Sequence, residues 1–77
     1  MSLPERFESY KGYVIRPFSI DLNGRWAVGA FIRSESSDNA ERSFQEKGKF
    51  AASYDEALEL GIAFGKFIVD TGAMSNP

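Results

Sequence analysis

Aromatic and β-branched residues are frequent between Tyr10 and Ile20, and such side chains suit the pleated surface of a β-strand. The stretch ends at Asp21-Leu22-Asn23-Gly24, where the Asn-Gly pair tolerates the positive φ angles of a tight hairpin turn. The pattern therefore predicts a strand over residues 10–20 and a second strand that returns antiparallel over residues 25–33.

Side chains of the second predicted strand alternate between the two faces of the sheet, because successive strand residues point in opposite directions. We expect the more apolar set to face the core, and it consists of Trp26, Val28, Ala30 and Ile32. The opposite face would then present Ala27, Gly29, Phe31 and Arg33.

A polar, turn-prone segment over residues 34–41 leads to a third predicted strand over residues 42–50. Strict alternation in this strand would place the carboxylate of Glu46 on one side with Phe44 and Phe50. Two interpretations stay open. Either Glu46 is a buried acid whose charged form is disfavoured by apolar surroundings, or Gly48 marks a β-bulge that resets the register and leaves Glu46 at an exposed position.

The residues Ser53-Tyr54-Asp55-Glu56 have the sequence of a capping box and predict the start of a helix. Its apolar pattern continues to Val69, and Gly72 is a suitable C-terminal cap. The expected fold class is α+β, with a three-stranded antiparallel sheet packed on one C-terminal helix. We expect one domain over residues 10–72, after an N-terminal arm over residues 1–9 that is flexible or docks on it, and before a disordered tail over residues 73–77.

The predicted helix carries more apolar surface than one buried face requires. One arc, expected to lie on the sheet, contains Ala57, Leu60, Gly61, Phe64, Phe67 and Ile68. An adjoining stripe contains Leu58, Ile62, Gly65 and Val69. Either the arm covers this stripe through Phe7 or Tyr10, or the stripe is the association surface of a homodimer in which Gly65 allows close approach.

At 77 residues the chain has room for one hydrophobic core. A core of this size leaves a surplus of only roughly 3–5 kcal/mol, so packing or self-association must supply the margin. The absence of Cys and His excludes disulfides, the usual zinc ligands and the commonest catalytic bases and nucleophiles. The acidic residues are scattered, and no spacing forces two of them together. We therefore expect no enzyme, no metal site and no cofactor.

The formal net charge of -2 argues against a general polyanion binder, whose affinity would come from many lysines and arginines. Residues 1–9 contain no apolar segment behind a basic start, and no apolar run is long enough to span a bilayer. These features predict a cytoplasmic protein without a membrane partner.

The sheet face opposite the helix mixes aromatic rings with guanidinium groups. We expect it to carry Arg16, Phe18, Phe31 and Arg33. Such a face suits nucleic acid, because arginines bind phosphates and aromatic rings stack on bases or sugars. A sheet covered on one side also exposes some aromatic residues without any binding function.

The order of these signals over residues 10–65 resembles two related DNA-binding domains, that of plant ethylene-response factors and the arm-binding domain of phage integrases. The residues that carry the resemblance are Tyr10-Lys11-Gly12, Arg16-Pro17-Phe18, Gly24-Arg25-Trp26, Ile32-Arg33, Gly48-Lys49-Phe50, and Ser53 with Glu56-Ala57. In that family the exposed sheet face enters the major groove. The resemblance implies that Arg16, Phe18 and Arg33 occupy the positions of its DNA-contacting residues.

The chain departs from that family where Val14 replaces a usual arginine, and where Phe44 and Glu46 replace an arginine and a tryptophan. It also resembles small bacterial proteins with a βββα layout, and that resemblance implies a fold and no activity. The sequence therefore favours a non-enzymatic binding or protein-interaction module, whose partner is another protein or a second copy of the chain. Nucleic-acid binding through the exposed sheet face is the alternative.

Overall fold

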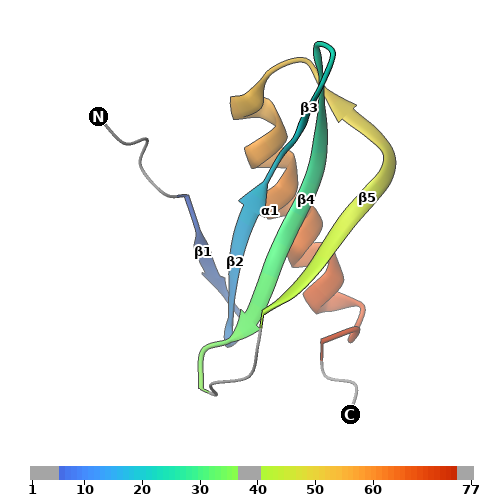
Figure 1. The fold of residues 1–77 in the computed structure, drawn as a ribbon. Coiled ribbons are helices and arrows are strands. Elements are labelled where there is room, and N and C mark those ends of the chain that lie inside the picture. The colour runs from blue at the N-terminus through green and yellow to red at the C-terminus, as the bar shows by residue number, and fades with distance from the viewer. Residues whose placement is uncertain (1–5, 37–40, 75–77) are drawn as a thin grey trace.

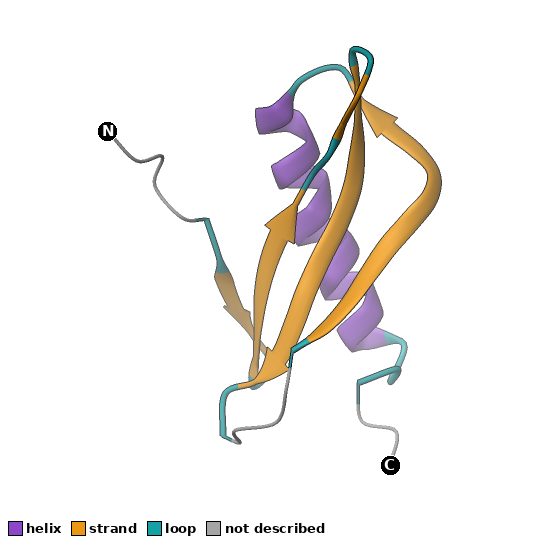
Figure 2. Cartoon of the chain, in the orientation of Figure 1, coloured by secondary structure: helices purple, strands orange, loops and turns teal. Residues whose placement is uncertain are grey.

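The computed structural model of the chain describes residues 6–36 and 41–74. Within them, an antiparallel sheet forms one layer and a single helix forms the other (Figures 1 and 2). The elements are β1 (Glu8–Tyr10), β2 (Tyr13–Phe18), β3 (Asp21–Leu22), β4 (Arg25–Ser34), β5 (Arg42–Ala51) and α1 (Tyr54–Asp70). The α+β class and the C-terminal helix are confirmed, but the sheet has five strands and not three.

The additional strands arise because the first predicted strand is interrupted twice. Lys11 and Gly12 both have positive φ, of 49° and 85°, and they form a tight turn between β1 and β2. A second break at Ser19 and Ile20 separates β2 from β3, and these two strands pair in succession with the same side of β4. The predicted arm is therefore partly sheet, since Glu8 pairs with Ile15.

The predicted hairpin turn is present between β3 and β4. Asn23 and Gly24 have φ values of 58° and 90°, and the Gly24 amide donates a hydrogen bond of 3.0 Å to Oδ1 of Asp21. This turn sets the start of β4, the central strand of the sheet.

Of the two interpretations of the third strand, the structure shows the β-bulge at Gly48, and this bulge explains the mixed pattern of β5. Gly29 pairs with Gln45 while Ala27 pairs with Phe50, so the intervening stretch of β5 is longer than that of β4. Gly48 lies in it with a φ of 79°. The bulge reverses the parity of the strand, so that Phe50 points to the face opposite α1.

The helix covers the face of the sheet that contains Val28, Ala30 and Ile32, as predicted, and these three residues are buried. Two glycines allow the helix to lie close to the strands. A Cβ atom on Gly61 would lie 2.6 Å from the carbonyl oxygen of Gly29, closer than van der Waals contact allows. Another on Gly65 would overlap Ile15. Residue size therefore fixes which helix face meets the sheet.

Both ends of α1 carry the predicted caps. The Ser53 hydroxyl accepts a hydrogen bond of 3.2 Å from the amide of Glu56, and the Glu56 carboxylate accepts one of 2.9 Å from the amide of Ala52. At the other end Gly72 has a φ of 83°, and its amide donates to the carbonyl of Val69. Beyond this cap, Met74 packs against the core, so the predicted tail is partly structured.

The remainder of that tail, residues 75–77, and the middle of the predicted loop, residues 37–40, lie outside the described residues. Among the residues that are described, no helix is long and apolar enough to cross a membrane.

Candidate binding surface on the open sheet face

The face of the sheet opposite α1 is open, because no other described helix or strand lies on it (Figure 2). Pairing of β2 with β4 sets Arg16 beside Phe31, Phe18 beside Gly29, and Val14 beside Arg33. The four residues predicted for this face, Arg16, Phe18, Phe31 and Arg33, therefore lie together on it. We call this surface the open face.

Two phenylalanines form the centre of the open face. The ring centroids of Phe18 and Phe31 are 4.7 Å apart, and the rings are tilted by 42°. Phe18 lies across Gly29, where any Cβ atom would overlap its ring. The glycine thus provides the space that lets the two rings meet, although both remain half-exposed.

Arginine side chains lie on aromatic rings at two places on this face. The guanidinium carbon of Arg16 is 4.6 Å from the ring centroid of Phe31, and that of Arg25 is 4.5 Å from that of Phe50. Such cation–π contacts hold the guanidinium groups flat on the surface. Arg16 also forms an ion pair of 2.8 Å with Glu41.

Sequence reasoning missed Arg25 and Phe50 as members of the open face. Their pairing depends on the bulge in β5, which changes the parity of Phe50 relative to Phe44. Gly48 was the available signal, but the number of residues that a bulge inserts cannot be read from a glycine alone. Ile20 and Leu22, which are 52% and 43% exposed, add apolar surface at the β3 end of the sheet.

Acidic side chains gather in the other layer. Those that lie on α1 or face it from the sheet are Glu8, Glu46, Asp55, Glu56, Glu59 and Asp70. The open face instead carries Arg16, Arg25 and Arg33. Each layer also holds charges of the other sign, because Lys11 and Lys66 pair with Asp70 and Glu8 beside α1, and Glu41 pairs with Arg16 of the open face.

The stripe predicted as an association surface lies against the sheet and not on the outside of the helix. Leu58 is only 8% exposed, Gly65 is buried against Ile15, and Ile62 and Val69 pack on the core cluster. The stripe is therefore part of the helix–sheet contact and not an outer surface. The helix is rotated from the predicted orientation, because its glycines make the closest approach.

The two rings that were expected to cover this stripe lie in different surroundings. Tyr10 packs against the core, whereas Phe7 remains 61% exposed above a shallow depression that it shares with Ile62. The ring at position 10 thus contributes to the core, and the ring at position 7 does not.

Polar contacts tie β1 and the following turn to α1. The Tyr10 hydroxyl donates a hydrogen bond of 2.9 Å to Asp70, the Lys11 ammonium lies 2.8 Å from the same carboxylate, and Lys66 pairs with Glu8. The hydrogen bond from Lys11, together with that from Tyr10, lowers the pKa of Asp70. In return, the hydrogen bond to Asp70 raises the pKa of Lys11, and that to Glu8 raises the pKa of Lys66.

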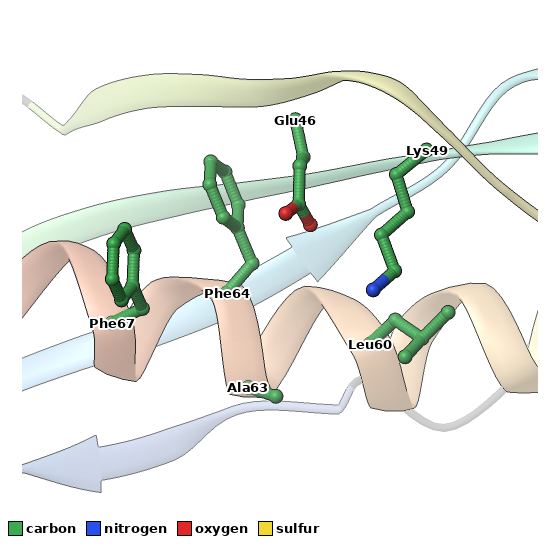
Figure 3. Close-up of a pocket in the computed structure, with 6 residues that line it drawn as sticks. All are labelled: Glu46, Lys49, Leu60, Ala63, Phe64 and Phe67. Atoms are coloured by element: carbon green, nitrogen blue, oxygen red, sulfur yellow. The ribbon is translucent and has the colours of Figure 1, made fainter.

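Glu46 lies in a groove between the β5 bulge and α1, half-buried and close to Lys49 (Figure 3). Glu46 is half-buried on an edge strand, so each of the two interpretations of this residue describes it in part. Within residues 6–36 and 41–74, no three acidic side chains are close enough to hold a metal ion.

The fold and the open face define a small two-layer α+β domain with one uncovered sheet surface. No protein-family model matches the chain, and neither the curated proteins nor the solved structures contain a match.

Proposed function

We propose that the chain is a non-enzymatic binding module that uses its open face to bind another protein. The observation that carries this proposal is the Phe18–Phe31 ring pair and, on the same face, Phe50, with Arg16 lying on Phe31 and Arg25 on Phe50. Aromatic residues and arginine are the types most enriched in protein interfaces and at their energetic centres. An apolar cluster left uncovered on so small a domain is typical of a docking site.

A protein partner is favoured over nucleic acid by the chemistry around the arginines. Arg16 is already paired with Glu41 at 2.8 Å, so a phosphate would have to compete with an intramolecular carboxylate. Ile20 and Leu22 extend the apolar part of the surface, which a protein can cover better than a phosphate backbone. The partner that fits best presents apolar side chains flanked by carboxylates.

Nucleic-acid binding is the second candidate, and the arginines of the open face favour it. Arg25 and Arg33 are exposed on the open face, while the acidic groups lie mainly with the helix. Rings beside arginines can stack on unpaired bases. This reading also agrees with the resemblance to sheet-face DNA-binding domains.

A non-enzymatic role is supported by the residue types present. The chain contains no His and no Cys, so acid–base or nucleophilic chemistry would depend on carboxylates, lysines or hydroxyls. The carboxylates on α1 are exposed, and Asp70 is held by Lys11 and Tyr10.

The test compares three immobilised proteins in the same cell extract: the natural chain, the double variant Phe31→Ala with Arg33→Ala, and Glu59→Ala as the control on the exposed side of α1. We expect a protein that is retained by the natural chain and the control but is lost from the double variant. Its affinity for the purified natural chain should exceed that for the double variant at least about tenfold. Equal retention by all three proteins would contradict the proposal.

Nucleic-acid binding is tested by a salt series with duplex and single-stranded DNA of mixed sequence. Binding that weakens steeply with salt, and that disappears in Arg16→Ala with Arg33→Ala, would establish the second candidate in place of the first. Absence of binding at low salt would exclude it.

A further inference from the structure

We propose that a second copy of this chain docks in the groove between α1 and the β5 bulge, forming a two-fold symmetric dimer. The groove has a volume of about 230 Å³ and is open to solvent. It is lined by Glu46, Lys49, Leu60, Ala63, Phe64 and Phe67. Figure 3 shows the two charged side chains reaching from β5 toward the helix, while Phe64 and Phe67 rise from it.

The helical part of the lining has the spacing of a helix–helix contact. Leu60, Ala63, Phe64 and Phe67 follow the pattern i, i+3, i+4, i+7, which forms one stripe along a helix. A different stripe, which includes Gly61 and Gly65, already packs on the sheet. Phe67 is 62% exposed, the largest exposed fraction among the large apolar side chains that the structure describes. The helix thus has a second apolar stripe that its own sheet leaves partly uncovered.

The charges at the rim of the groove indicate that the occupant is another copy of the chain. Glu46 and Lys49 have opposite signs, both come from the bulge, and neither has an ion-pair partner within the described part of the chain. A two-fold interface brings each surface against itself, so it needs a surface that is complementary to itself. An acid and a base that lie along the same strand, beside an apolar helix stripe, meet that condition, because a two-fold axis between them sets each acid against the base of the other copy.

The same complementarity holds for shape. The groove is a recess, and Phe67 is a protruding ring at its border, so each copy can insert this ring into the recess of the other. Two α1 helices then run antiparallel, with the small side chain of Ala63 allowing them to approach. Glu46 of each copy faces Lys49 of the other. This contact leaves the open face free, so the inference is independent of the proposed function.

Sedimentation equilibrium of the full chain over a wide concentration range tests the dimer. We expect the mass to rise from that of one chain, 8.6 kDa, to twice that value. Phe67→Glu should raise the dissociation constant at least about tenfold, because it removes the central ring of the interface. Circular dichroism verifies that this variant is folded, and Lys47→Glu on the same bulge serves as the control for a change of charge outside the groove.

A charge exchange identifies the facing residues. Glu46→Lys and Lys49→Glu should each weaken self-association, since like charges would meet across the axis. An equimolar mixture of the two variants should form a mixed dimer more tightly than either variant forms its own, because both contacts then join opposite charges. A chain that remains at 8.6 kDa at every concentration would overturn the proposal. So would a mixture that shows no preference, or a Phe67→Glu variant that associates as the natural chain does.

Discussion

At the scale of single residues, three glycines determine how the layers meet and what the open face looks like. Gly61 lies under the carbonyl of Gly29, and Gly65 lies against Ile15. On the other side of the sheet, Gly29 makes room for the ring of Phe18. The helix and the aromatic cluster therefore meet at the same point of β4 from opposite sides.

Alanine at position 61 tests this close approach. Within an exposed helix, replacing glycine by alanine stabilises the fold by about 1 kcal/mol. We expect Gly61→Ala to destabilise it instead, by about 1–3 kcal/mol, because the new Cβ atom would meet a backbone oxygen that cannot rotate away. Gly65→Ala should cost less, since it meets only the side chain of Ile15. Urea unfolding followed by circular dichroism measures both.

Glu59→Ala is the matched control for these variants, because position 59 is on the exposed side of the same helix. Its stability should change by no more than about 0.5 kcal/mol. A Gly61→Ala chain at least as stable as the natural one would show that the helix does not depend on contact at this position.

At the scale of elements, local signals identified the turn and both helix caps correctly, and Gly48 indicated the bulge as one of two alternatives. Asn23-Gly24, Gly48, Ser53 with Glu56, and Gly72 each report a backbone conformation that short stretches of sequence determine. The rotation of α1 could not be predicted in this way. Its apolar residues extend around most of the helix, so the pattern did not distinguish the stripe that packs on the sheet from the stripe that borders the groove.

The same limit applies to the first predicted strand. Its apolar composition continues through the turn at Lys11-Gly12, and a positive φ at a lysine has no signal of its own in the sequence. For the candidate site, strand parity was sufficient to place Arg16, Phe18, Phe31 and Arg33 together. The additional residues of that face required the register of β5, which depends on tertiary pairing.

The helix cap provides a prediction at this scale. Ser53→Ala should destabilise the fold by about 1 kcal/mol, because the amide of Glu56 would lose its acceptor. Glu56→Ala should have a similar effect through the amide of Ala52. The double variant is expected to cost less than the sum, since both bonds stabilise the same turn. Thermal and urea unfolding of the two single variants and the double variant measure this double-mutant cycle, with Ser43→Ala in β5 as the control. Strictly additive losses would indicate that the two bonds act separately.

The contact between the β1–β2 turn and the end of α1 should depend on pH. The pKa of Asp70 in the folded chain is below its usual value of 3.8, because Lys11 and Tyr10 hydrogen-bond to the charged carboxylate. A carboxyl group whose pKa is lowered on folding stabilises the fold at pH values above its unfolded-state pKa. This contribution is lost as the pH falls through its folded-state pKa. Asp70→Asn should therefore be less stable than the natural chain near neutral pH and equally stable in strong acid.

Unfolding measured from neutral to acidic pH tests this expectation. The stability of the Lys11→Met variant should become equal to that of the natural chain in the same acidic range, because this variant also removes the Lys11–Asp70 pair. On the alkaline side, the pKa of Lys11 is raised above 10.5, so its contribution is present below that value and is lost as the pH rises through the folded-state pKa. If the difference in the free energy of unfolding between Asp70→Asn and the natural chain stayed constant across the acidic range, the Lys11–Asp70 pair would be excluded as its cause.

At the scale of the whole molecule, the fold is built from two layers, one sheet and one helix. The helix buries one face of the sheet and leaves the other uncovered. A domain of this size has little stability to spare, so each element that adds to the core has a large effect. Strand β1 is such an element, because it brings Tyr10 to the core from near the beginning of the chain.

Two truncations locate where the folded unit begins. Removal of residues 1–7 should change the free energy of unfolding by no more than about 1 kcal/mol, because Phe7 is largely exposed and the contacts of Arg6 with Asp55 are exposed. Removal of residues 1–10 also takes away β1 and the ring of Tyr10, and it should cost roughly 2–3 kcal/mol. With a total margin of roughly 3–5 kcal/mol, only about 0–3 kcal/mol would remain, so the shorter chain should unfold at a much lower urea concentration. Equal stability of the two truncated chains would mean that the sheet does not need β1, and that the folded unit begins at β2, close to the boundary at residue 10 that the sequence predicts.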